Sequence, residues 1–150
     1  MLILEPLLSA EITLAEPQEL GGTPQGRRRI IYITGGTFSG PRLKGRVLPG
    51  GADWQVVRED GVAVLDTRYT LETHDGALIY VQNRGLRHGP PEVMERLARG
   101  ENVDASLYYM RSHPSFETGD PRYAWLNKIV CVGSGERLAN AVKLEMYEVK

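Results

Sequence analysis

The sequence predicts an all-β, mainly antiparallel protein with one short helix. Three observations lead to this class. Apolar and polar residues alternate along most of the 150-residue chain, and a period of two is that of a half-buried strand. Glycine and proline divide the alternating runs at even intervals, and only one segment has a helical pattern. Evenly spaced strands joined by glycine-rich turns favour a barrel or a sandwich.

The alternation predicts the strands in chain order. Residues 16–26 are expected to form a loop, and the glycines and prolines of residues 35–54 are expected to bend an extended segment. The expected strands are residues 8–15, 27–34, 53–58, 62–73, 77–84, 105–111, 123–132 and 141–149.

The segment GPPEVMERLARGE, residues 89–101, is the expected helix. Proline is tolerated in the first turn because its missing N–H would be unpaired there. Glu92 near the start and Arg99 near the end match the helix dipole, and Gly100 can end the helix.

The composition is that of an ordinary globular domain. Hydrophobic residues make up 41% of the chain and charged residues 25%, so residues 1–150 are expected to form a single domain. The formal net charge of −1 argues against a nucleic-acid partner. No stretch approaches the ~20 apolar residues that cross a bilayer, and the start lacks the basic region of a signal peptide. Cys131 is the only cysteine, which favours a reducing compartment, and we expect a cytoplasmic protein.

Two Asp-Gly pairs, residues 60–61 and 75–76, separate alternating runs and predict hairpins with two-residue type I′ turns. This register pairs Asp53 with Arg68, and it gathers polar residues from three strands on one face. That polar row consists of Asp53, Gln55, Asp66, Arg68 and Asn83.

The polar row has two interpretations. In the first it is the solvated exterior, and the opposite face with Trp54, Leu65 and Tyr69 is the core. In the second it is the floor of a ligand cavity inside a barrel too wide to be filled by side chains. Valines beside a few charged and amide groups are typical of such a pocket. The pattern leaves both open.

The segment YYMRSHPSFETGDPRYAWLN, residues 108–127, is the densest aromatic stretch. Alternation places Tyr123, Trp125 and Asn127 on one face of an expected strand, and Arg111 shares a face with Tyr109. Rings beside hydrogen-bonding groups suit a small-molecule pocket, and packing in the core is the alternative.

Two long motifs, GGTFSGPRLKGRVLPGGADW and FETGDPRYAWLN, closely resemble a bacterial and fungal family catalogued as domain of unknown function 3237. The resemblance covers about residues 2–149. It implies a lipocalin-like or calycin-like β-barrel that commonly assembles as an oligomer, and it implies no particular reaction. The matching polar and aromatic positions are Asp53, Trp54, Asp66, Arg68, Tyr69, Tyr80, Tyr108, Arg111, Phe116, Tyr123, Trp125 and Asn127.

Signatures of cofactor or metal sites are not found in the sequence. The glycine-rich stretch lacks the GK[ST] ending of a phosphate loop, and no GxSxG elbow is present. His74, His88 and His113 lack the spacing of metal ligands. We expect no cofactor and no metal.

Two functional hypotheses follow, both with a small-molecule ligand. The first is a cofactor-free acid–base enzyme, of isomerase, cyclase or lyase type, acting on an apolar or aromatic organic acid or ketone. In it Asp53 or Asp66 is the base, Arg68 and Arg111 hold an oxyanion, and a tyrosine acts as the acid. The second is a carrier barrel in which the same groups only orient the ligand. The further expected ligand contacts are Gln55, Tyr80, Asn83, Tyr123, Trp125 and Asn127.

A third hypothesis is a structural, oligomerising domain with a filled barrel and no cavity. The predicted register leaves an apolar face uncovered, and large apolar patches are uncommon on monomers. We therefore expect a homo-oligomer.

Overall fold

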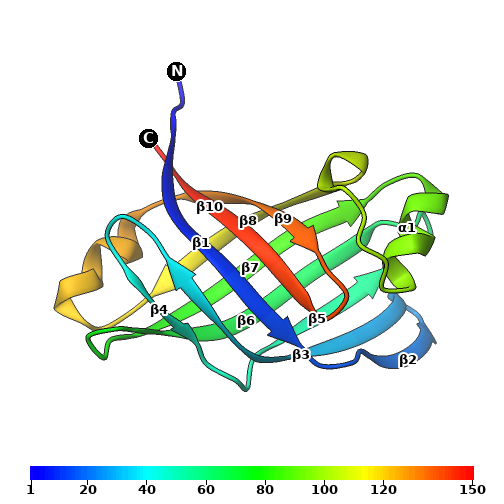
Figure 1. The fold of residues 1–150 in the computed structure, drawn as a ribbon, viewed down its shortest axis with the longest axis horizontal. Helices are drawn as coiled ribbons and strands as arrows, with labels where there is room; N and C mark the ends of the chain where they lie inside the picture. The colour runs from blue at the N-terminus through cyan, green and yellow to red at the C-terminus, as the bar shows by residue number, and fades with distance from the viewer.

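The structure, a computed structural model, describes residues 1–150 and is a closed antiparallel β-barrel (Figure 1). Its elements are β1 Leu4–Leu14, β2 Gln18–Thr23, β3 Gly26–Ser39, β4 Lys44–Val47, β5 Ala52–Val57, β6 Ala63–Thr73, β7 Leu78–His88, α1 Pro91–Ala98, the 3-10 helix η1 Ala105–Leu107, β8 Tyr109–Glu117, the 3-10 helix η2 Pro121–Lys128, β9 Cys131–Arg137 and β10 Ala141–Val149. Strand β1 pairs with β10 on one side and with β3 on the other, which closes a ring of eight strands. Strand β4 also pairs with β3 and β6, as β5 does, and it buries Val47 in the core, whereas β2 pairs only with β3.

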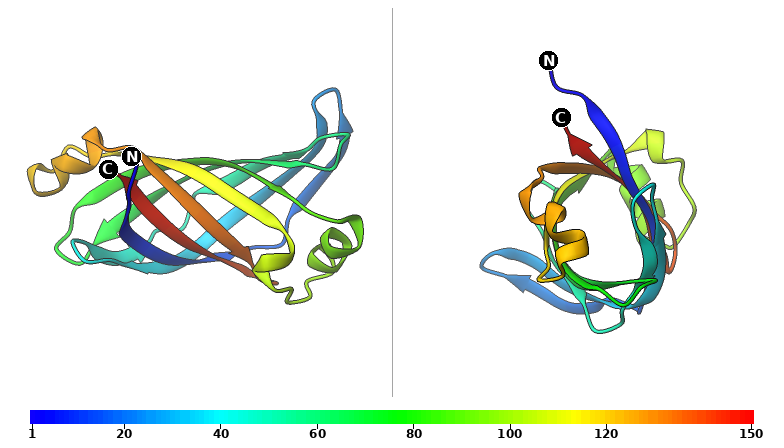
Figure 2. Two further views of the ribbon diagram at one scale, coloured as in Figure 1. Left: turned by 90° about the horizontal axis from the view of Figure 1, so that it is seen from above. Right: turned by 90° about the vertical axis from the view of Figure 1, so that its left-hand side faces the viewer.

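The two ends of the barrel are covered by different elements (Figure 2). At one end η2 lies across the opening, and its Tyr123 and Leu126 are buried in the larger apolar cluster of the core. At the other end α1 packs Val93 and Leu97 into a smaller cluster that includes Leu65. No helix of the chain is long and apolar enough to span a membrane.

The predicted fold class is confirmed, whereas several element boundaries differ. The expected loop at residues 16–26 contains β2. The expected strand at residues 105–111 begins with η1, and β8 starts only at Tyr109. The expected strand at residues 123–132 is mostly η2. The helix lies where it was predicted, with Pro91 in its first turn and Gly100 just beyond its end at a φ of +80°.

The predicted type I′ turns are wrong, because both Asp-Gly loops contain three residues. In the first hairpin the Arg58 N–H donates to the Val62 carbonyl at 2.9 Å, and Gly61 has a φ of +85°. No residue other than glycine has a positive φ, so Asp60 does not adopt the left-handed conformation that a type I′ turn requires. The second hairpin has the same form around Gly76, whose φ is +89°.

The extra loop residue shifts each hairpin register by one. Asp53 lies opposite Thr67 and not opposite Arg68, and Thr67 in turn lies opposite Asn83. Because side chains alternate along a strand, a shift of one residue moves a strand's polar set to the other face of the sheet.

The polar row is therefore divided between the two sides of the barrel wall. Asp53, Gln55 and Asn83 face the interior, where Gln55 and Asn83 are buried. Asp66 and Arg68 face outward, and their predicted place beside Asp53 is wrong.

Candidate functional site

The barrel encloses a cavity of about 60 Å³ between the two apolar clusters. Each of the eight ring strands contributes two of its sixteen lining residues, and half of these are hydrophobic. An eight-stranded barrel is just wide enough to be filled by side chains or to hold one small ligand. The charged and amide side chains that reach the cavity are Asp53, Gln55, Asn83, Arg87 and Arg137.

Strand alternation places these side chains. Asp53 and Gln55 are two apart on β5, and Asn83 and Arg87 are four apart on β7, so each pair points to the same side of the wall. Arg137 ends β9, where its backbone N–H donates to the buried Tyr108 hydroxyl at 2.8 Å.

Asp53 is the one carboxyl group that lines the cavity. Its Oδ1 accepts the Asp66 backbone N–H at 2.9 Å, and its Oδ2 accepts the Gln55 Nε2–H at 3.0 Å. Burial raises the pKa of Asp53 above its usual value, and these hydrogen bonds oppose the rise only in part. Asp53 therefore holds its proton more tightly than a solvated carboxylic acid.

A chain of hydrogen bonds connects Asp53 to the rim of the barrel. Gln55 accepts from the Arg29 Nη1–H at 3.0 Å, and the Arg29 Nε–H donates to Glu19 at 2.9 Å. Because Gln55 accepts from a guanidinium, its amide group must present its N–H to Asp53. Arg29 at the rim thus fixes the orientation of the Gln55 amide beside the Asp53 carboxyl.

Arg87 and Arg137 are cations without a protein partner. Neither makes an ion pair, and Arg87 Nε and Arg137 Nη1 are buried without a hydrogen bond. Burial, followed by repulsion from Arg137, lowers the pKa of Arg87 to about 10. Burial, followed by repulsion from Arg29, lowers the pKa of Arg137. Both remain charged near neutral pH, so the site carries excess positive charge.

A groove of about 540 Å³ lies at the α1 end of the barrel. We call it the mouth groove. Arg87 and Arg137 line both the mouth groove and the interior cavity, so they stand at the neck between them. Its charged lining residues are Arg27, Arg29, Arg87, Arg99, Arg137 and Glu16.

The two other predicted catalytic residues lie on the outer surface. Asp66 Oδ2 is 3.5 Å from Arg68 Nη2, and Asp66 Oδ1 is 3.7 Å from Arg84 Nε. Asp66 reaches the site only through its backbone N–H, which donates to Asp53.

Two of the predicted ligand contacts also lie outside the barrel. Tyr80 is exposed on the outer face of β7, and Arg111 on β8 donates to the Met110 carbonyl and lies over the Tyr109 ring. These two residues do not converge with Asp53.

The predicted aromatic face at residues 123–127 does not exist, because η2 winds these residues around a 3-10 helix. The Asn127 side chain accepts the Thr118 N–H at 2.8 Å and donates to the Thr118 carbonyl at 2.9 Å. Arg42 lies over the Trp125 ring at 3.5 Å from its centroid. These contacts fasten η2 to the barrel and are distant from the cavity lining.

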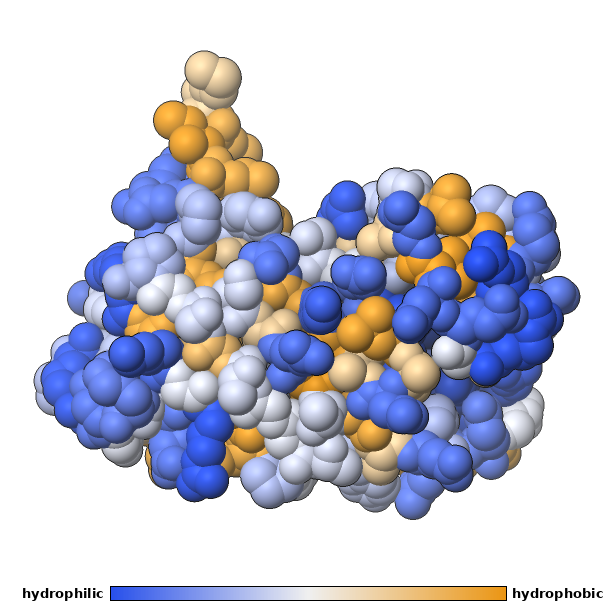
Figure 3. Space-filling model, viewed as in Figure 1, coloured by the Kyte–Doolittle hydropathy of each residue, from blue (hydrophilic) through white to orange (hydrophobic).

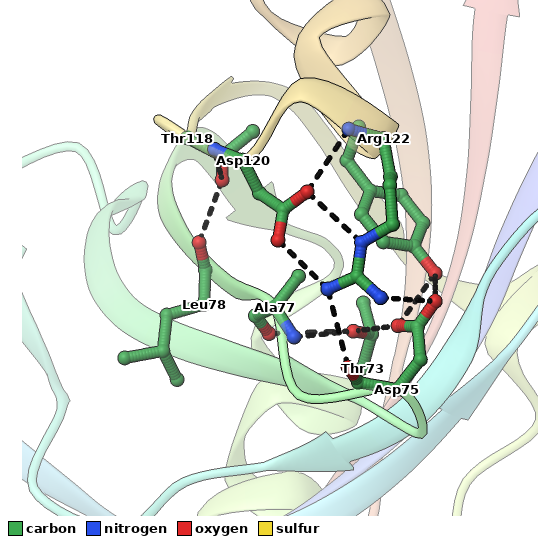
Figure 4. Close-up of polar contacts among 8 residues, drawn as sticks. Thr73, Asp75, Ala77, Leu78, Thr118, Asp120 and Arg122 are labelled. Atoms are coloured by element: carbon green, nitrogen blue, oxygen red, sulfur yellow. Dashed lines mark hydrogen bonds and ion pairs between the residues drawn. The ribbon is translucent and has the colours of Figure 1, made fainter.

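The hairpin at Asp75 holds η2 in place (Figure 4). The Tyr123 hydroxyl donates to Asp75. Arg122 Nη1 is 3.1 Å from Asp75 Oδ2, and Arg122 Nη2 is 2.8 Å from Asp120 Oδ2. The Thr118 hydroxyl donates to the Leu78 carbonyl at 2.7 Å. These polar contacts hold η2 over this end of the barrel, whereas a groove leads into the barrel at the α1 end.

Arg87 and Arg137 line the cavity but are not among the residues predicted from the sequence. The signal for Arg87 was present, since continuing the alternation of β7 from Asn83 through Gly85 places Arg87 on the same face. The expected strand ended at residue 84 and left it out. Arg137 could not be found in this way, because residues 123–132 were assigned to the wrong element.

The chain is similar to several proteins of known sequence. It is 46% identical over 124 residues to a UPF0311 protein of Rhodopseudomonas palustris, covering 83% of this chain and 81% of that one. It is 41% identical over 146 residues to a UPF0311 protein of Clostridium acetobutylicum, covering 97% and 92%. It is also 25% identical over 147 residues to the hydroalkoxylation enzyme phnH of Penicillium herquei, covering 98% and 83%.

A solved structure has the same fold. The crystal structure of a beta-barrel like protein from Acinetobacter baumannii superposes with a TM-score of 0.88 at 52% identity, covering 100% of this chain and 97% of that one. The family described as "Protein of unknown function (DUF3237)" matches residues 3–149. With this match and the 41–46% identity to the UPF0311 proteins, the chain belongs to the DUF3237 family.

Proposed function

We propose that this protein is a cofactor-free acid–base enzyme that acts on a small, largely apolar organic molecule inside the barrel. The observation that carries the proposal is Asp53, a carboxyl group with a raised pKa that faces a cavity lined half by hydrophobic residues. Enzymes raise the pKa of carboxylic acids in this way so that the acid form is available near neutral pH.

The proposed reaction class is addition of a hydroxyl group across a carbon–carbon double bond, or its reverse. The relative in Penicillium herquei is named a hydroalkoxylation enzyme, which supports this class. In such an addition one carbon receives a proton, the other carbon bonds to oxygen, and the hydroxyl proton leaves. The reaction needs no oxidant. In our proposal Asp53 gives its proton to carbon and recovers the hydroxyl proton.

Two amide side chains support this role. Gln55 holds Asp53 through the bond at 3.0 Å, so the carboxyl is presented in one orientation. Asn83 Oδ1 is buried without a partner in the same cavity, and it can accept a hydrogen bond from a substrate hydroxyl. Pre-orientation of this kind lowers the entropic part of the barrier.

The test is proton exchange and turnover in D₂O, followed by NMR. The panel contains 2-(3-methylbut-2-enyl)phenol, whose ring closure is a hydroalkoxylation, together with simple phenols, enols and ketones. We expect wild type to act on at least one compound and Asp53→Asn to be slower by roughly 10²–10⁴-fold. Arg84→Gln, on the outer face of β7, is the matched control and should keep the wild-type rate. Equal rates for wild type and Asp53→Asn on every compound would overturn the proposal.

The second candidate is a carrier barrel, favoured by the convergence of charged and amide side chains on one small cavity that leads to the mouth groove. It predicts that a ligand stabilises the protein without being converted. The free energy of unfolding should rise by about 2.7 kcal/mol at a ligand concentration of a hundred times the dissociation constant, and the unfolding temperature should rise with it.

A further inference from the structure

Within the proposed function, we infer that the substrate is an apolar carboxylic acid whose carboxylate bridges Arg87 and Arg137 at the neck of the barrel. This inference rests on the proposed function in one respect, because the bound acid is a substrate only if the protein is an enzyme. The binding site itself stands on separate residues from the acid–base group.

Both arginines have unused hydrogen-bonding capacity. Arg87 is only 7% exposed, and its Nε has no partner, while Nη1 of Arg137 is buried and has none either. Other arginines of the chain pair with acids, as Arg122 does with Asp75 and Asp120. A buried cation without a partner is costly to the fold, and a bound anion removes that cost.

Asp53 attracts both guanidiniums but forms an ion pair with neither. It lies within 4 Å of neither guanidinium nitrogen, and burial favours its neutral form. Arg87 and Arg137 repel each other, and Arg29 repels both. The neck therefore holds two positive charges that Asp53 balances only in part, and a bound anion would complete the balance.

The shape of the two guanidinium groups favours a carboxylate. Two planar guanidiniums that each present a buried N–H match two oxygens of one planar carboxylate. The five arginines and single glutamate of the mouth groove attract anions toward the neck. Behind the neck the cavity is lined by Ile31, Leu65 and Leu144, which suit a short apolar group.

The experiment measures binding by titration calorimetry with isobutyrate, benzoate and phenylacetate, each compared with its neutral amide and with phenyl phosphate. We expect at least one carboxylate to bind wild type at millimolar concentration and its amide not to bind. Arg87→Gln and Arg137→Gln should each weaken that carboxylate about tenfold or more. Arg84→Gln should leave its affinity unchanged, because Arg84 faces outward.

Protein folding is checked by the unfolding temperature of each variant. If Arg87→Gln does not fold, Arg137→Gln and the charge-keeping Arg87→Lys decide the question. The inference is overturned if no carboxylate binds, if the amide or phenyl phosphate binds as tightly, or if both glutamine variants keep wild-type affinity.

Asp53→Asn separates this inference from the proposed function. If carboxylates depend on Arg87 and Arg137 while Asp53→Asn keeps full turnover, the inference stands and the proposed function falls. If Asp53→Asn abolishes turnover of neutral compounds while Arg87→Gln and Arg137→Gln bind carboxylates as tightly as wild type does, the proposed function stands and the inference falls.

Discussion

At the scale of single residues, Asp53 shows how the barrel changes ordinary chemistry. The same side chain on a solvated strand would be ionised at neutral pH. Here an apolar wall and a closed ring remove it from water, while Gln55 and the Asp66 N–H limit the effect. The site is therefore expected to reduce the stability of the fold, as functional sites commonly do.

This gives a prediction for Asp53→Asn. Because the folded-state pKa of Asp53 is raised, its contribution to stability is complete below the unfolded pKa of about 3.9 and is lost as pH rises through the folded pKa. Asparagine stays neutral, so Asp53→Asn should gain stability relative to wild type as pH rises from 4 to 8, by about 1.4 kcal/mol for each unit by which the pKa is raised. Urea unfolding across this range measures the difference.

Asp60→Asn is the control of opposite sign. Arg58 lowers the pKa of Asp60 to about 2, so its contribution is present above the unfolded pKa and is lost on acidification. This variant should be less stable than wild type at neutral pH, with the difference shrinking in acid. A stability difference for Asp53→Asn that does not change with pH would contradict the prediction.

At the scale of elements, the two hairpins show the limit of local reasoning. The Asp-Gly pairs correctly predicted where the chain turns, and the helix at residues 91–98 followed from its prolines and its terminal glycine. Loop length was not predictable, because a two-residue and a three-residue loop accept the same dipeptide. That single residue decides whether Asp66 and Arg68 join Asp53 or face solvent.

The glycine at the end of each loop gives a second prediction. Gly76 has a φ of +89° and open space around its Cβ position, so Gly76→Ala tests backbone strain alone. We expect a loss of about 1–2 kcal/mol of unfolding free energy, and a smaller loss for Gly76→Asn, because asparagine tolerates this conformation better. Gly22→Ala, also in open space but without a positive φ, should cost less. Equal stability of the two alanine variants in urea would contradict the left-handed conformation of Gly76.

Helix η2 shows a different limit. Tyr123 and Trp125 alternate like strand residues, yet the buried pair is Tyr123 and Leu126, three positions apart, which is the period of a 3-10 helix. The Asp120 side chain accepts the Arg122 N–H, and Pro121 fills the first turn. This Asp-Pro start was a helix signal that the aromatic alternation concealed.

At the scale of the whole molecule, ring closure creates the site. Asp53, Asn83, Arg87 and Arg137 come from three strands and meet only because β1 joins β10 to β3. With η2 latched over one end, the arginine-lined mouth groove is the entrance.

The exposed apolar surface of the molecule bears on self-association. The predicted apolar face is wrong in part, since Leu65 and Tyr69 are buried inside the barrel. Another apolar surface takes its place, because the projecting N-terminal arm exposes 77% of Leu2 and 61% of Ile3 (Figure 3). We propose that this arm contacts a second copy of the chain.

Light scattering at micromolar concentration tests this proposal. We expect a mass above the 16.7 kDa of one chain, and a shift toward 16.7 kDa when Leu2 and Ile3 are both replaced by serine. A wild-type mass of 16.7 kDa would contradict it.

The sequence by itself determined the all-β class, the single helix, the turn positions and the family, because alternation, capping residues and long motifs are local properties. It also identified Asp53, Gln55 and Asn83 as a polar group among apolar neighbours. Only the tertiary structure decided which residues face the cavity and added Arg87 and Arg137 to them. The physical reason is that strand register decides which side of the barrel wall each side chain points to. Register in turn depends on one loop residue and on closure of the ring, and neither leaves a signal in the local pattern.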